Sequence, residues 1–256
     1  MCRWLAYLGK PVYLEKYLFE PEHSLIAQSL NPERTAVTAN GDGFGVGWYG
    51  ERPEPGQYRE ILPAWNDPNL RSLAAQIRSG LFFAHVRAST GTETSRVNCH
   101  PFVHGNWMFM HNGQIGGYER VRRALDALLP DALYTRRRGT TDSEAFFYLL
   151  FHFGLETDPE GAWRKTVAAV LNETKRAGVT EPFRMTAILT DGEVLYGLRY
   201  ATDPIPPSLY WSCEKDALLV VSEPLDSDKL HWSEVPAGAL LLAEGHGQAA
   251  VEPFHI

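Results

Sequence analysis

The sequence has few cysteines and no long apolar run. Its 256 residues include three cysteines, Cys2, Cys99 and Cys213, and none belongs to a CxxC pair. An odd number of widely spaced cysteines indicates neither a disulfide framework nor a thiolate zinc site, and it fits a reducing, cytoplasmic compartment. The late apolar run at residues 239–243 is far shorter than the ~18 residues of a membrane span, and the first residues lack a signal-peptide pattern. We expect neither export nor a membrane partner.

Positive charge is scarce as well. The chain has 24 lysines and arginines against 31 aspartates and glutamates, a formal net charge of −7. Because this balance repels a phosphate backbone, no nucleic-acid partner is expected. Internal repeats and low-complexity tracts are absent, and 44% hydrophobic residues are enough to bury a core. The length indicates one large domain over residues 1–256.

Several short segments have the alternating polarity or the aromatic and β-branched content of strands. They are residues 2–8, 44–49, 81–86, 107–110, 184–189, 194–199, 208–212, 217–221 and 239–242. Asp191-Gly192 between two of them predicts a tight turn and an antiparallel pair. Residues 51–57 and 202–207 are rich in turn-forming residues and predict loops.

Helical spacing of apolar residues occurs at 70–77, 118–129 and 163–171. Thr141 with Glu144 predicts a capping box that opens another helix. Strands interleaved with helices predict an α+β fold in which sheets pack against each other under helical layers. The periodicity leaves the topology open.

Cys2 is the first candidate for chemistry. Methionine is normally removed before a small second residue, and Cys2 would then carry both a thiol and a free α-amine. An α-amine has a pKa near 7.7 to 8.0, so it can accept the thiol proton and make one residue both nucleophile and base. The alternative is a small buried core cysteine without a chemical role.

Two further candidates follow predicted strands. Arg87 ends an apolar segment and can bind a carboxylate with two parallel hydrogen bonds; the alternative is a surface arginine at a strand end. Asn112-Gly113 most often forms a hairpin turn, but the asparagine amide and the glycine N–H can also form an oxyanion hole. Such a donor stabilises an acyl-transfer transition state by about 3 to 4 kcal/mol.

Asp142 falls in the first turn of a predicted helix, where its charge suits the helix dipole; it can also anchor a substrate ammonium. A metal site from Cys99, His100, His104 and His111 is a weaker alternative, because their spacing matches no common ligand motif. With such a metal site, the protein would be a metal-dependent hydrolase that uses the three histidines.

Six motifs occur in order and together resemble one family. They are Met1-Cys2-Arg3, the glycine-rich segment 40–48, His85-Val86-Arg87, His100-Pro101-Phe102, His111-Asn112-Gly113 and Thr141-Asp142-Ser143-Glu144. This series resembles the class II glutamine amidotransferases, which are N-terminal-nucleophile (Ntn) hydrolases, and looks most like their stand-alone YafJ-like and EgtC-like branch. The resemblance implies a four-layer αββα sandwich of two antiparallel sheets.

The resemblance also implies an activity and a set of roles. Cys2 would be the nucleophile, Asn112 and Gly113 the oxyanion hole, and Arg87, Thr90 and Asp142 the binding groups for a γ-glutamyl substrate. The implied reaction is hydrolysis of the γ-amide of glutamine or of a γ-glutamyl conjugate through a thioester, with no metal or organic cofactor. Two alternatives stay open: supply of ammonia to a separate acceptor synthase, and an inactive γ-glutamyl-binding protein.

Overall fold

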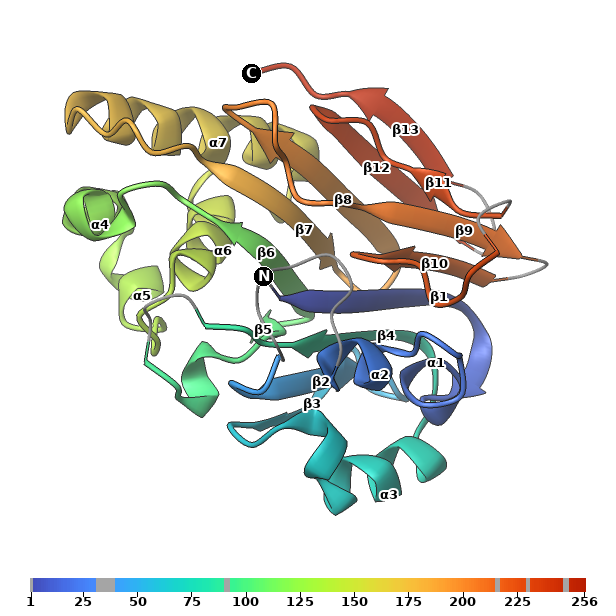
Figure 1. Ribbon diagram of the computed structural model, residues 1–256. Coiled ribbons are helices and arrows are strands. Elements are labelled where there is room, and N and C mark those ends of the chain that lie inside the picture. The colour runs from blue at the N-terminus through green and yellow to red at the C-terminus, as the bar shows by residue number, and fades with distance from the viewer. Residues whose placement is uncertain (1, 31–39, 90–92, 215–216, 229–230, 246–248) are drawn as a thin grey trace.

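Two antiparallel sheets lie face to face in the computed structural model, which describes residues 2–30, 40–89, 93–214, 217–228, 231–245 and 249–256 (Figure 1). The seven-stranded sheet has the order β11-β9-β10-β1-β4-β2-β3, and β1 and β4 share the longest pairing. Its strands are β1 (Arg3–Tyr13), β2 (Phe44–Trp48), β3 (Gly56–Glu60), β4 (Arg78–Val86), β9 (Tyr210–Glu214), β10 (Ala217–Val221) and β11 (Ser233–Glu234).

The six-stranded sheet has the order β13-β12-β8-β7-β6-β5. Its strands are β5 (Phe102–His104), β6 (Trp107–Gln114), β7 (Arg184–Thr190), β8 (Val194–Ala201), β12 (Ala239–Glu244) and β13 (Ala249–Pro253). Asp191-Gly192 joins β7 to β8, and Asp191 Oδ1 accepts from the N–H groups of Glu193 and Val194 at 2.9 Å. The predicted antiparallel pair is therefore confirmed.

Helices cover the outer face of each sheet (Figure 1). Beside the seven-stranded sheet lie α1 (Glu15–Leu18), α2 (Leu25–Leu30) and α3 (Pro68–Gln76), with the 3₁₀ turn η1 (Ala64–Asn66). Beside the six-stranded sheet lie α4 (Tyr118–Asp126), α5 (Asp131–Tyr134), α6 (Asp142–His152) and α7 (Pro159–Arg176). A second 3₁₀ turn, η2 (Arg96–Asn98), precedes β5.

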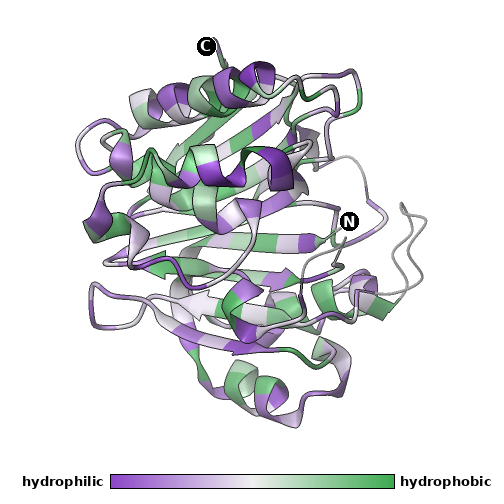
Figure 2. Cartoon of the chain, turned by 90° about the vertical axis from the view of Figure 1, so that its left-hand side faces the viewer, coloured by the Kyte–Doolittle hydropathy of each residue, from purple (hydrophilic) through white to green (hydrophobic). Residues whose placement is uncertain are grey.

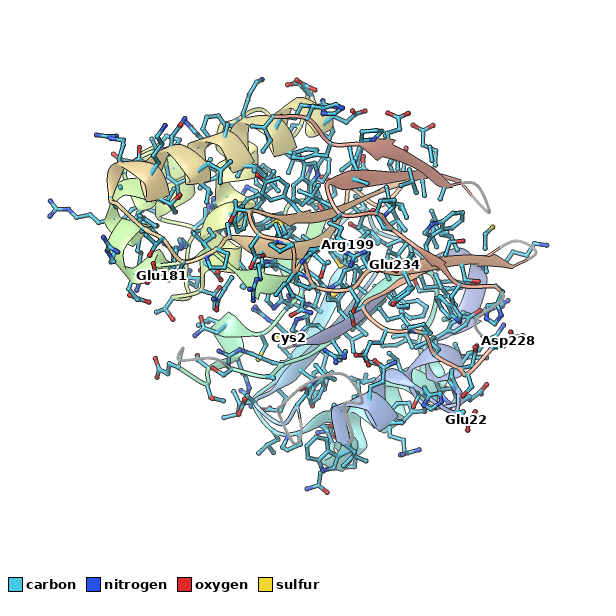
Figure 3. The ribbon with its side chains drawn as sticks, turned by 45° about the horizontal axis from the view of Figure 1, so that its top comes forward. Cys2, Glu22, Glu181, Arg199, Asp228 and Glu234 are labelled. Carbon is cyan, nitrogen blue, oxygen red and sulfur yellow. The ribbon has the colours of Figure 1, made fainter. Side chains whose placement is uncertain are left out.

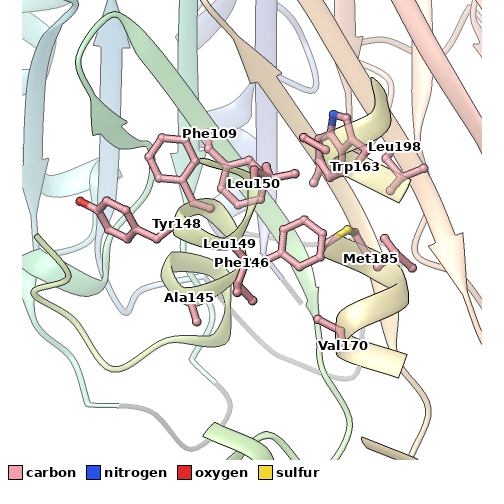
Figure 4. Close-up of a cluster of buried hydrophobic side chains, with 14 of the residues drawn as sticks. Phe109, Ala145, Phe146, Tyr148, Leu149, Leu150, Trp163, Val170, Met185 and Leu198 are labelled. Atoms are coloured by element: carbon pink, nitrogen blue, oxygen red, sulfur yellow. The ribbon is translucent and has the colours of Figure 1, made fainter. Parts of the chain in front are cut away.

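Three separate hydrophobic cores define the layers. Phe109, Phe146 and Trp163 belong to the core between the six-stranded sheet and its helices (Figure 4). The other two cores lie between the sheets and under α1 to α3. In the hydropathy colouring, green apolar residues occur along the strands of both sheets, and the helices carry both green and purple residues (Figure 2). The predicted four-layer sandwich is confirmed.

Strand β1 shows how the sequence produces this layering. Trp4 and Ala6 belong to the core between the sheets, whereas Leu5 and Tyr7 belong to the core under the helices. Successive side chains of a strand point to opposite faces. Because both faces are covered, the strand is apolar almost throughout instead of alternating with polar residues.

Three predictions of local structure need correction. The loop predicted over residues 51–57 is too long, because β3 begins at Gly56. The capping box forms only in part: Thr141 accepts from the N–H of Glu144 at 3.2 Å, but the Glu144 carboxylate accepts instead from the N–H groups of Arg138 and Gly139. Strands β3, β5, β11 and β13 were not predicted, because all are short or lie at or next to a sheet edge. Among the described helices, none is long and apolar enough to cross a membrane.

Candidate active site

Cys2 lies at the start of the central strand β1, beside the end of β4. The pairing of Arg3 with Val86 brings the sulfur next to Ala88, the second residue after this neighbouring strand. The N–H of Ala88 donates to Cys2 Sγ at 3.5 Å, and the thiol lies 3.6 Å from the Ala88 carbonyl oxygen. The thiol is thereby held against a backbone N–H and a backbone carbonyl.

A buried ion pair fixes the backbone on the other side of Cys2. Arg3 Nη1 donates to the Cys2 carbonyl at 3.0 Å, and Arg3 Nη2 donates to Glu223 Oε1 at 2.5 Å. Both side chains are buried, with 3% and 8% of their surface exposed. Separating the two side chains would leave one buried charge without its partner, so breaking the pair has a high free-energy cost. Arg3 and Glu223 therefore hold the Cys2 backbone in position.

Burial controls the protonation state of the thiol. It raises the pKa of Cys2, while the Ala88 hydrogen bond and the Arg87 charge lower that pKa in part. Burial disfavours the thiolate because the charge loses its solvation by water. The thiol therefore stays protonated at neutral pH, and a nucleophilic Cys2 needs a base within reach.

Four of the predicted site residues line one cavity of about 490 Å³, namely Cys2, Arg87, Gly113 and Asp142. They come from the start of β1, the end of β4, the end of β6 and the start of α6. Cys2 lies near the centre of the molecule, whereas Glu181, on the rim of the same cavity, lies toward the periphery (Figure 3). The cavity therefore connects the partly buried Cys2 with the surface.

Arg87 is buried, and the surrounding backbone orients it. Its guanidinium donates to the Asp42 carbonyl at 3.3 Å, to Ser89 Oγ at 3.1 Å and to the Glu93 carbonyl at 3.3 Å. The Asp42 carboxylate in turn accepts from the N–H of Ser89 at 2.7 Å. The glycine-rich segment containing Asp42 thus fixes both the arginine and the chain that follows it.

Asp142 is the first residue of α6, as predicted. Its Oδ2 accepts from the N–H of Ile115 at 2.8 Å, and its Oδ1 accepts from the N–H of Ser143 at 2.8 Å. Ser143 Oγ also lies 2.8 Å from His111 Nδ1. The helix N-terminus and these donors stabilise a carboxylate at the cavity wall.

Asn112 and Gly113 lie inside β6 and form no hairpin turn, so the turn interpretation of this dipeptide is wrong. Gly113 has φ +147°, and a Cβ added there would lie 2.0 Å from the Arg184 carbonyl oxygen. Both residues line a second, smaller cavity of about 140 Å³ that also reaches Cys2. The strand therefore brings Asn112 and Gly113 to a cavity that Cys2 also lines.

The histidines do not assemble the alternative metal site. Within the described part of the chain, no three His, Cys, Asp or Glu side chains are placed to hold a metal ion. His100 stacks on His85 with ring centroids 4.3 Å apart, so the rings meet face to face. His104 lies instead against Tyr148 and Phe151. Thr90 lies outside the described residues, so its predicted place at the pocket stays a prediction.

Comparison with known proteins identifies the family. The family model for glutamine amidotransferases class-II matches residues 20–202. The probable glutamine amidotransferase DUG3 of Saccharomyces cerevisiae is 33% identical over 94% of this chain and 81% of its own length. This chain belongs to the class II glutamine amidotransferases. The γ-glutamyl-hercynylcysteine sulfoxide hydrolase of Mycolicibacterium smegmatis is 29% identical over 92% of both chains.

Solved structures agree with this assignment. The glutamine aminotransferase class-II domain protein of Silicibacter pomeroyi superposes with a TM-score of 0.79 at 40% identity and covers all of both chains. The glutamine phosphoribosylpyrophosphate amidotransferase of B. subtilis has a TM-score of 0.64 at 16% identity, with half of its chain covered. The second likeness shows the fold alone. The resemblance inferred from six motifs is therefore confirmed, as is the stand-alone branch, since a YafJ protein is also among the relatives.

In this amidotransferase, sequence reasoning missed three residues that support the site. Ala88 contacts the sulfur through its backbone, Glu223 holds Arg3, and Ser143 joins Asp142 to His111. Ser143 lies within the Thr141-Asp142-Ser143-Glu144 motif, so the sequence did carry a signal for it. Glu223 is 220 residues from its partner, and Ala88 has no functional group, so no sequence signal pointed to either.

We expect the buried histidines to make this amidotransferase less stable in acid. Burial lowers the pKa of His85 to about 3 and also lowers the pKa values of His100 and His111. The unfolded chain then binds more protons than the folded one between pH ~6.5 and ~3, so stability falls as the pH drops through this window. From pH 7 to 4.5, His85 alone should lower the free energy of unfolding by about 3 kcal/mol.

Urea unfolding across that pH range measures this loss. His85→Gln should reduce the slope of stability against pH by about one proton, because glutamine does not titrate. His255→Gln changes an exposed histidine near the last strand and serves as the matched control. An equal slope in wild type and His85→Gln would show that His85 does not contribute.

Proposed function

We propose that this amidotransferase hydrolyses the γ-amide of glutamine or of a γ-glutamyl conjugate through a thioester on Cys2. The observation that carries the proposal is the convergence of a partly buried thiol, an arginine and a carboxylate on one cavity. The hydrolase relative, whose substrate is a γ-glutamyl conjugate, supports the same reaction class. Cys2, Asn112 and Gly113 are the proposed catalytic residues, and Arg87, Thr90 and Asp142 the proposed binding residues.

Substrate recognition rests on two opposite charges at different points of the cavity wall. The Arg87 guanidinium binds the α-carboxylate of the glutamyl group, because its planar N–H groups match a carboxylate. The Asp142 carboxylate binds the α-ammonium. The two contacts fix the glutamyl chain and leave its γ-carbonyl toward Cys2, so the reacting atoms are held close together.

Acylation needs a base because the thiol is protonated. Removal of Met1 gives Cys2 a free α-amine, which accepts the thiol proton as sulfur attacks the γ-carbonyl carbon. The Asn112 amide and the Gly113 N–H stabilise the negative oxygen of the tetrahedral intermediate. The C–N bond then breaks, and the leaving amine takes the proton from the α-ammonium. Water hydrolyses the thioester by the same path, with the α-amine again as base, and releases glutamate.

Two measurements test the proposal. Met1-trimmed protein, verified by intact mass, is incubated with glutamine and with γ-glutamyl conjugates, and glutamate release is followed. The glutamine analogue 6-diazo-5-oxo-norleucine is then added, and the labelled peptide is mapped. Glutamate release together with a label confined to Cys2 is expected. A trimmed, folded protein that neither turns over nor takes the label would favour the inactive binding protein.

Arg87→Lys tests the binding role. Lysine keeps the charge but loses the two parallel hydrogen bonds, so we expect KM for glutamine to rise roughly 10-fold to 100-fold with a smaller change in kcat. Arg164→Lys changes a partly exposed arginine on α7 and is the matched control. Steady-state kinetics on both variants decide the question. An unchanged KM in Arg87→Lys would remove Arg87 from the binding site.

Two finer expectations belong to the same proposal. A cytoplasmic location fits the three free thiols, Cys2, Cys99 and Cys213, and cell fractionation would test it. Transfer of ammonia to a separate acceptor synthase stays a prediction. If such a partner controls the site, glutaminase turnover should rise when cell extract is added, and an unchanged basal rate would count against it.

A further inference from the structure

The smaller cavity beside Cys2 extends beyond the residues that the proposed reaction uses. Besides Cys2, Asn112 and Gly113, its walls contain Ala88, Gln114, Arg184 and Pro207. It shares Cys2, Ala88, Gly113 and Gln114 with the large cavity, but neither Arg87 nor Asp142 lines it. The two cavities therefore meet at Cys2 and extend from it toward different residues.

An acyl-transfer site needs space in two directions. The carbonyl carbon next to sulfur bears the glutamyl chain on one side and the leaving nitrogen on another. The glutamyl chain extends toward Arg87 and Asp142 in the large cavity. Any substituent on the leaving nitrogen must point away from that chain, and the smaller cavity is the space that opens at Cys2 without these two residues.

Arg184 brings a guanidinium to the smaller cavity, where it is ion-paired with Asp203. Among the described residues that line it, Arg184 is the only one with an ionised side chain. The guanidinium is oriented by Asp203, which accepts from Nε at 3.0 Å and from Nη2 at 2.5 Å. Nη1 makes no hydrogen bond to the described residues and keeps its two N–H groups for another acceptor. A guanidinium held in this way can donate two hydrogen bonds to a carboxylate.

Pro207, another residue of the cavity wall, lies in a connection that is held by hydrogen bonds. Pro207 belongs to the β8–β9 connection, which also contains Pro204 and Pro206. Arg199 Nε donates to the Pro207 carbonyl at 2.8 Å, and Arg199 Nη1 donates to Glu234 Oε1 at 2.7 Å. Figure 3 shows Arg199 and Glu234 side by side, near the middle of the molecule. Proline restricts the backbone, and a fixed wall lowers the entropy cost of binding.

From these contacts we infer that the smaller cavity is the subsite for the leaving amine. Arg184 selects amines that bear a carboxylate. Such amines are amino acids or short peptides that are joined to the γ-glutamyl group through their amine. This inference rests on the proposed function. Sulfur bonds to the γ-carbon, the C–N bond breaks, and the amino acid leaves with the proton from the Cys2 α-ammonium. Free glutamine, whose leaving group is ammonia, has no substituent that extends to Arg184.

A pair of substrates that differ only in charge tests the inference. γ-Glutamylglycine and γ-glutamylglycinamide have the same size, but only the first carries a carboxylate on its amine side. We expect wild-type kcat/KM to favour γ-glutamylglycine by at least about 10-fold, since charge-assisted hydrogen bonds are the stronger class. Arg184→Gln should lower this preference roughly 10-fold to 100-fold and leave glutamine turnover nearly unchanged.

Two further variants locate the effect. The double variant Arg184→Gln with Asp203→Asn removes the whole ion pair. If the preference is lost in both Arg184→Gln and the double variant, the loss is due to the arginine and not to an exposed Asp203 charge. Arg120→Gln removes the arginine on the outer wall of the large cavity. If Arg120→Gln abolishes the preference and Arg184→Gln does not, the amine lies in the large cavity and the inference is wrong.

The outcomes also separate the inference from the function on which it rests. Failure of trimmed wild type to cleave glutamine and both γ-glutamyl substrates would overturn the proposed function. Cleavage of all three without preference for the carboxylate, unchanged by Arg184→Gln, would overturn the subsite alone.

Discussion

Cys2→Ala is expected to lower kcat for γ-glutamyl hydrolysis by at least about 10³-fold, because removal of the nucleophile leaves only binding and the oxyanion hole to act on water. The fold should survive. The lost side chain contacts Ala88 through a long sulfur hydrogen bond of 3.5 Å, so we expect a stability change of about 1 kcal/mol or less. Glutamate release and thermal unfolding, measured on the same sample, check the two halves of the prediction.

Cys213→Ala is the matched control for this substitution. Cys213 lies in β9, which is three strands from β4 in the sheet order, and it does not line either cavity at Cys2. Its substitution should leave turnover and labelling by 6-diazo-5-oxo-norleucine unchanged. Intact mass must show that Met1 is absent from both variants, because a retained Met1 would remove the α-amine that acts as base. Native turnover in a trimmed, folded Cys2→Ala protein would show that another group is the nucleophile.

The sequence predicted most of the fold because its central strands are buried on both faces. In β1 and β6 such burial requires long apolar runs, and these are visible without a structure. Strand β3 was missed because it follows a turn-rich segment and all five of its residues are only partly buried. A strand of this kind has little hydrophobic signal, since its pairing with β2 depends on backbone hydrogen bonds that any sequence can make.

The candidate site was predictable to the extent that it uses special side chains in a fixed order. Cys2, Arg87 and Asp142 each carry a group with distinct chemistry, and the structure places all three at one cavity. Arg184 carries an equally distinct group, but it reaches Cys2 only through the pairing of β6 with β7. A contact of this kind depends on strand register, which polarity patterns alone did not give.

Among the glycines that the structure describes, the same pairing leaves Gly113 very little freedom to change. Its φ of +147° is unfavourable for any residue with a side chain, and an added Cβ would lie 2.0 Å from the Arg184 carbonyl oxygen and 2.8 Å from His111 Nε2. Gly113→Ala must therefore push β6 away from β7 at the proposed oxyanion hole. We expect stability to fall by about 2 kcal/mol or more and kcat to fall by at least about 10²-fold.

Gly105→Ala separates the effect of a positive φ from the effect of a steric clash between an added Cβ and a neighbouring strand. Gly105 precedes β6 at its other end and also has positive φ, at +57°, but nothing lies within 4 Å of its added Cβ. The Gly105→Ala variant should lose about 1 kcal/mol of stability and keep full turnover.

Asn112→Ala extends the test if Gly113→Ala does not fold. It removes the other proposed oxyanion-hole donor without a steric clash, so it should lower kcat by about 10² to 10³-fold with little change in KM. Wild-type kcat in Asn112→Ala, or in a folded Gly113→Ala protein, would place the oxyanion hole elsewhere.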